Sequence, residues 1–138
     1  MDWINGMIVA GHGVAGGSGK DSRFPSGTIA MQKPYFLAQG IDLSPYFEGT
    51  LNVHLASMAP APKRICFRGL VKWRDDIEEL FTLSAVEVEV DGCRYSGLWY
   101  YPHPETKPEH FQPKTVVELL LPWIAGLAPG RVIKLRFA

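Results

Sequence analysis

Alternation of apolar and polar residues predicts β-structure over most of the second half of the chain. The clearest run is 81–90, which leads into Asp91-Gly92, a dipeptide typical of a two-residue hairpin turn. The return strand, 93–101, is rich in aromatic residues, which are typical of core and cross-strand packing. Residues 115–121 form an almost continuous apolar run, and residues 131–137 alternate again. Each of these runs predicts a strand.

The first half predicts shorter elements. Residues 7–10 and 65–73 read as strands, whereas 28–40 predicts the only substantial helix of the chain. Pro34 lies inside that helical pattern, so we expect either two short pieces or a helix that begins near Pro34. The charged residues 74–79 are expected to form a solvated turn.

Five or six strands, one short helix and two long loops predict a mainly β protein that forms a small closed barrel. With 138 residues, the chain is expected to be a single domain, 1–138. The two long loops are a glycine-rich segment at 11–19 and a proline-rich segment at 102–113. Loops of this length are often functional, so we expect them to cover a ligand.

Composition and charge exclude several classes of protein. Apolar residues make up 46% of the chain and charged residues 20%, which is typical of a folded globular protein. Fourteen basic and fourteen acidic residues cancel, which argues against a nucleic-acid partner, but a small phosphate ligand needs only a local site. The chain shows neither a membrane-length apolar run nor signal-peptide features, so we expect a cytoplasmic protein with no membrane partner.

The two cysteines, Cys66 and Cys93, are too few for a disulfide framework or a zinc site. We expect buried thiols in a reducing compartment, and a single bridge stays open as the alternative.

The central stretch 44–55 begins as a turn and continues as a short alternating strand. Apolar residues are predicted on one face and polar residues on the other; the two sets are Leu51, Val53 and Leu55, and Thr50, Asn52 and His54. The hydroxyl of Thr50 and the amide of Asn52 form an oxygen-rich edge that suits a hard cation already carrying phosphate oxygens. The alternative interpretation is a polar outer strand face with no ligand.

The glycine-rich loop holds five glycines within residues 11–19 and is followed by Lys20 and Arg23. Its backbone can approach a ligand closely and offer N–H groups to anionic oxygens, and the two cations favour phosphate. It matches neither a P-loop nor a dinucleotide-binding fingerprint. A surface loop with no ligand is the alternative.

Glu118 lies within the apolar run 115–121 and shares a predicted strand face with Val116 and Leu120. Because an unpaired buried charge is costly, Glu118 is expected to have a partner or a ligand.

Four features in chain order resemble the archaeal-type CTP-dependent riboflavin kinases, a cradle-loop barrel family. They are a strand running into a glycine-rich loop at 9–16, the string Pro-Tyr-Phe-Glu-Gly-Thr-Leu-Asn at 45–52, a hairpin at 92–97, and an apolar strand with an internal glutamate before proline at 117–122. Together they span most of the chain, from about residue 7 to residue 137.

The resemblance implies a six-stranded cradle-loop barrel with one short helix and long ligand-covering loops. It implies phosphoryl transfer from CTP to the ribityl hydroxyl of riboflavin, giving FMN and CDP. In that family Thr50 and Asn52 would hold Mg²⁺. Glu118 would lie by the ribityl chain as the catalytic residue, and Thr106 would contact the flavin phosphate, although only with a gap in the alignment. The nucleotide-binding backbone would be that of Gly11, His12, Gly13, Val14, Ala15 and Gly16.

The chain also departs from the family. Phe47 or Glu48 is an extra residue in the central string, and residues 123–126 stand where the family places basic residues near the nucleotide. The second change favours an alternative hypothesis, a diverged non-catalytic barrel that binds a nucleotide or flavin. A third hypothesis is a DNA-binding swapped-hairpin barrel, which suits the pattern of the last strand, whereas the zero net charge argues against it.

Overall fold

The computed structural model describes residues 3–10, 28–56, 62–103 and 115–138. The predicted nucleotide loop, Gly11–Gly16, and the predicted flavin contact Thr106 lie outside the described residues. Within the described ranges the chain forms these elements in order: β1 (Ile4–Val9), α1 (Thr28–Ala38), β2 (Leu51–Leu55), β3 (Ile65–Arg74), β4 (Ile77–Val90), β5 (Cys93–Pro102), β6 (Val116–Leu120) and β7 (Val132–Phe137).

Six of the strands close into an antiparallel barrel in the order β4-β5-β6-β2-β1-β7, and β7 pairs back with β4. Closure leaves the barrel itself without an exposed sheet edge. The structure therefore confirms the predicted fold class, a mainly β protein with a closed six-stranded barrel and one helix in the described part of the chain.

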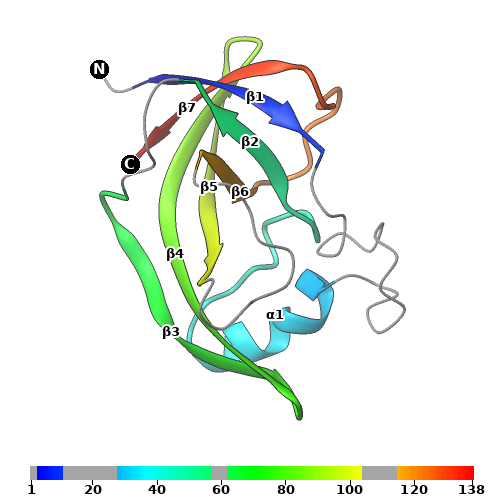
Figure 1. Cartoon of the computed structure of the whole chain (residues 1–138), viewed down its shortest axis with the longest axis vertical. Coiled ribbons are helices and arrows are strands. Elements are labelled where there is room, and N and C mark those ends of the chain that lie inside the picture. The colour runs from blue at the N-terminus through cyan, green and yellow to red at the C-terminus, as the bar shows by residue number, and fades with distance from the viewer. Residues whose placement is uncertain (1–2, 11–27, 57–61, 104–114) are drawn as a thin grey trace.

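The long strand β4 belongs both to the barrel and to an extension of the sheet beyond the barrel. Its second half pairs with β7 inside the barrel, from Val86 to Glu89, whereas its first half pairs with β3 from Ile77 to Ser84. Figure 1 shows β4 curving from the barrel down towards α1, with β3 alongside its lower half. The sheet thus extends past the barrel and gives the helix a surface to pack on.

Two apolar cores follow from this arrangement, one on each face of the shared strands. In β4, Val86 and Val88 face the barrel interior, whereas Phe81 and Leu83 have the opposite parity and face α1. The buried residues of the helix-side core are Ile29, Phe36, Leu43, Val71, Trp73, Phe81, Leu83, Leu98, Tyr100 and Leu120. β4, β5 and β6 are therefore buried on both faces where the two cores overlap.

The helix α1 passes through Pro34 without interruption, so the expected break there is wrong. Proline removes one backbone donor, but Ile29 and Phe36 are buried on either side of it, and this tertiary packing stabilises the helix across the defect. The helix ends at Ala38, and Gly40 follows with a φ of 91°. There the N–H of Ile41 donates to the carbonyl of Phe36 at 3.0 Å, a bond typical of a glycine-terminated helix end.

The solvated turn expected at 74–79 is confined to Asp75 and Asp76. Arg74 ends β3 and Ile77 begins β4, so four of these six residues lie in strands. Glu79 is only 6% exposed, and its carboxylate accepts a hydrogen bond from the indole of Trp73 at 3.1 Å, which offsets part of the cost of burying it.

The cysteines also differ from expectation. Cys66 and Cys93 are both free and exposed, because each lies on a solvent-facing position of its strand. As to membrane spans, none of the helical segments in the described ranges has the length and apolar character that crossing a bilayer requires.

Candidate functional site

Three polar side chains lie in one row across neighbouring strands of the barrel. Glu118 on β6 is the register partner of Asn52 on β2 and of Tyr100 on β5. Directly paired residues of antiparallel strands project from the same face of the sheet. The row Asn52–Glu118–Tyr100 therefore lies on the outer face of the barrel, the face that α1 covers further along.

Thr50 completes this row from the end of the preceding loop. Its hydroxyl donates a hydrogen bond to Oε1 of Glu118 at 3.0 Å, in a half-buried setting. The chain neighbours of the glutamate, Val117 and Leu119, are buried, so its backbone is held firmly. The prediction that Glu118 needs a partner is confirmed, because a hydroxyl donor offsets part of the cost of desolvating the carboxylate.

The far end of the row is buried beneath α1. The hydroxyl of Tyr100 donates to Oε1 of Gln32 at 2.7 Å, and both side chains are almost fully excluded from solvent. Burial raises the pKa of the Tyr100 phenol well above its usual value, and the nearby negative charge of Glu118 adds to the rise. Tyr100 therefore remains a neutral donor beside a carboxylate.

The loop before β2 is fixed at several points. Ser44 donates its backbone N–H to Asp42 at 2.9 Å, and the bonds from Ser44 lower the pKa of Asp42. The backbone N–H of Phe47 donates to the carbonyl of Leu121 at 2.8 Å, which ties the loop to the end of β6. Lys33 of α1 lies 3.0 Å from Glu48. These contacts set the position from which Thr50 reaches Glu118.

Strand β2 has the predicted two faces. Val53 and Leu55 are buried in the barrel core and Leu51 packs against it, whereas His54 is exposed on the opposite face. Asn52 shares that face with His54, and it makes interactions of its own. The alternation in the sequence therefore predicts correctly which residues of β2 face the barrel core and which face outward.

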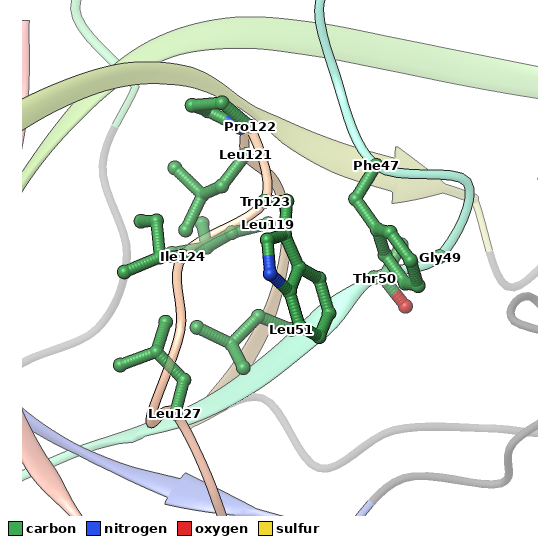
Figure 2. A pocket seen from close by; sticks show the side chains of 10 residues that line it. All are labelled: Phe47, Gly49, Thr50, Leu51, Leu119, Leu121, Pro122, Trp123, Ile124 and Leu127. Carbon is green, nitrogen blue, oxygen red and sulfur yellow. The ribbon is translucent and has the colours of Figure 1, made fainter.

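A pocket with a volume of about 120 Å³ lies on the barrel side of the same loop. Figure 2 shows the exposed rings of Phe47 and Trp123 side by side at one edge of it. Their centroids are 5.1 Å apart with an interplanar angle of 49°. The described residues that line it are Phe47, Gly49, Thr50, Leu51, Leu119, Leu121, Pro122, Trp123, Ile124 and Leu127. Thr50 therefore belongs to both the pocket and the polar row.

The donor atoms of the row determine whether it could hold the predicted Mg²⁺. The described residues hold no cluster of three histidine, cysteine or carboxylate side chains that could form a protein cage for an ion. Three members of the row, Thr50, Asn52 and Glu118, offer one hydroxyl, one amide and one carboxylate. Mg²⁺ in phosphate-handling sites commonly takes one or two carboxylates and completes its shell with water and substrate phosphates. The set fits an ion that arrives with phosphate.

The structure brings three of the sequence-predicted site residues together, Thr50, Asn52 and Glu118. Two features of this region were not predicted from the sequence, namely the Tyr100–Gln32 pair and the contact between Phe47 and Trp123. The Tyr100–Gln32 pair could have been predicted only if the strand order had been known, because that order places Tyr100 beside Glu118 on the face that α1 covers. Nothing in the sequence indicates the second, because its two rings come from separate loops.

Comparison with known proteins gives no assignment: no protein-family model matches this chain, and a search of curated proteins finds no similar sequence.

Proposed function

We propose that this barrel is a Mg²⁺-dependent phosphotransferase that resembles the CTP-dependent riboflavin kinases. In the proposed reaction the terminal phosphoryl group of CTP passes to the ribityl hydroxyl of riboflavin. A bond forms between the hydroxyl oxygen and phosphorus, the bond from phosphorus to the CDP oxygen breaks, and the hydroxyl proton leaves. The products are FMN and CDP.

The observation that carries the proposal is the hydrogen bond from Thr50 to Glu118, in a row with Asn52. Three residue types suited to phosphoryl transfer meet there from two segments that are far apart in the sequence. Phosphoryl transfer asks a protein mainly for positioning and for neutralisation of charge. A row of a hydroxyl, an amide and a carboxylate on rigid strands is suited to both tasks.

Each residue of the row has a distinct task in this proposal. Thr50 binds Oε1 of Glu118 and fixes the orientation of the carboxylate, which leaves Oε2 to accept the hydroxyl of the substrate. Glu118 orients or deprotonates that hydroxyl, as a general base does. Mg²⁺, when bound by Thr50 and Asn52 together with substrate phosphates, supplies neutralisation of the phosphate charge.

A second candidate function is a diverged barrel that binds a nucleotide or flavin without catalysis. One observation favours it: Trp123 is 72% exposed in the segment where the resembled family has basic residues near the nucleotide. A site without those cations has less means of stabilising charge on a phosphate in transfer.

A turnover assay separates the two functions. Purified protein is incubated with riboflavin and Mg²⁺, and CTP, ATP, GTP and UTP are offered separately while FMN is resolved from riboflavin by chromatography. FMN formed with one nucleotide supports the kinase and identifies the donor. No FMN with any donor, from protein shown to be folded, contradicts the kinase and favours the binding barrel.

Alanine variants test whether the side chains of the row are required for the activity. Thr50→Ala and Asn52→Ala are expected to lose Mg²⁺-dependent turnover. His54→Ala is the matched control, because His54 is an exposed residue on the same face of β2 as Asn52. Full activity in both row variants would contradict the proposed role of these side chains.

A further inference from the structure

Two large aromatic side chains are exposed at the mouth of the pocket. Trp123 is 72% exposed and Phe47 is 49% exposed, although their rings contact each other. Water-exposed aromatic area beside a concave surface is unfavourable unless something covers it, and it often marks a binding site. This pair belongs to two of the segments in which the chain departs from the resembled family.

The pocket walls decide the chemistry of an occupant. Among the described residues, the ten that line the pocket carry no charge, and aliphatic side chains form most of their surface. A phosphate or carboxylate held against these walls would lose its hydration without gaining a cation from them, which is costly. The cavity volume of about 120 Å³ is close to the roughly 150 Å³ that holds one benzene ring in a protein interior. The occupant must therefore be small, and uncharged where it contacts the walls.

The geometry of the aromatic pair then limits where a ring can lie. A third ring between Phe47 and Trp123 would need the two to stand about 7 Å apart, twice a carbon–carbon contact, whereas their centroids are 5.1 Å apart. In the view of Figure 2 the indole lies between the Phe47 ring and the side chains of Ile124 and Leu127. The side of the Trp123 indole turned away from Phe47 is thus the one available for stacking, and Phe47 contacts its other side.

We infer that this pocket binds a flat, uncharged heteroaromatic ring, which stacks on the side of the Trp123 indole turned away from Phe47. The inference rests on the proposed function for the source of the ring, which is either the base of the nucleotide or the flavin. Thr50 connects the two parts of the site, because it lines the pocket and also donates to Glu118. A ring held in the pocket lies next to the loop that carries the reactive row.

Ring binding is measured without any phosphate donor. Riboflavin binding is followed by quenching of flavin fluorescence, and cytidine binding by calorimetry, each with the full chain. We expect one of the two to bind. Trp123→Ala is expected to weaken that binding about 5- to 150-fold, the effect of losing one ring stack. Trp123→Phe retains a ring and should restore most of the affinity.

The matched control is Tyr35→Ala, which removes another exposed aromatic ring, on α1, outside the pocket lining. It should leave the affinity unchanged. Equal binding by wild type and Trp123→Ala, or no binding of either compound to the folded wild type, overturns the inference. Ring binding without FMN formation would overturn the proposed kinase and leave the ring site standing, so the two failures are distinguishable.

Discussion

Thr50 and Glu118 are 68 positions apart in the chain, and the hydroxyl of the first donates to the carboxylate of the second at 3.0 Å. The antiparallel pairing of β2 with β6 brings them together, since it places Asn52 directly opposite Glu118. Thr50 precedes that pairing by two residues, and so it approaches the carboxylate from the end of the strand. One loop residue therefore sets the orientation of the single acidic group in the row.

The Thr50–Glu118 bond should contribute measurably to stability. Thr50→Val removes the donor while nearly preserving the shape of the side chain, and we expect the free energy of unfolding to fall by about 1 kcal/mol, since the pair is only half-buried. Thr50→Ser keeps the hydroxyl and is the control, with an expected change well below that. Urea denaturation measures both. If Val and Ser variants unfold at the same urea concentration, the hydrogen bond does not hold Glu118.

Closure of the barrel should depend on two glycines. A Cβ at Gly97 would overlap the backbone carbonyl of Leu120, and one at Gly6 would overlap Val53 in the core. We expect Gly97→Ala and Gly6→Ala each to lower the free energy of unfolding by about 2–3 kcal/mol, because well-packed strands cannot move apart without losing contacts.

Gly69→Ala is the matched control for these variants. Its nearest neighbour would be the end of the Phe67 ring at 3.2 Å, a flexible side chain that can shift. The expected cost is about 1 kcal/mol or less. Chemical denaturation of the three variants checks the order. A Gly97→Ala protein as stable as Gly69→Ala would contradict the close approach of β5 to β6.

Tyr100 should make the fold sensitive to alkaline pH. Burial and the charge of Glu118 raise its pKa in the folded state, so the folded protein binds that proton more tightly than the unfolded chain does. Stability is then fully present below the unfolded pKa of about 10 and is lost as the pH rises above it towards the folded pKa.

The measurement is the free energy of unfolding of wild type and Tyr100→Phe from pH 8 to pH 11. The variant should be less stable at pH 8 by about 1–3 kcal/mol, because the buried amide oxygen of Gln32 loses its donor. It should also lose less stability between pH 10 and pH 11 than the wild type. Tyr35→Phe, at an exposed tyrosine, should keep the wild-type pH dependence. Identical pH dependence in Tyr100→Phe and wild type would contradict the burial of the phenol.

Local patterns were sufficient to predict most strands, because alternation reports directly which face is buried. The hairpin at Asp91-Gly92 was predictable from its dipeptide, and both residues have the positive φ that such a turn requires. Pro34 could not be assessed in the same way, since the packing of Ile29 and Phe36 that keeps the helix continuous is tertiary.

The candidate site was likewise predictable only in part from local sequence patterns. Glu118 stood out because a carboxylate in an apolar strand needs a partner, but the identity of that partner depends on which strands are neighbours. The order β5-β6-β2 is not written in any single segment, and it decides that Thr50, Asn52 and Tyr100 surround Glu118. The contact between Phe47 and Trp123 could not be predicted either, because the two rings come from separate loops that only the folded barrel brings together.

The most direct test of the central claim compares FMN formation by the wild type and by Glu118→Gln, with riboflavin, Mg²⁺ and the nucleotide that supports turnover. Glutamine keeps an oxygen for the Thr50 hydroxyl but cannot act as a base. The account predicts that kcat falls by a factor of about 10²–10⁴, the usual contribution of a general base, while the urea midpoint stays close to that of the wild type. A Glu118→Gln protein that forms FMN as fast as the wild type, or a folded wild type that forms none with any nucleotide, would contradict it.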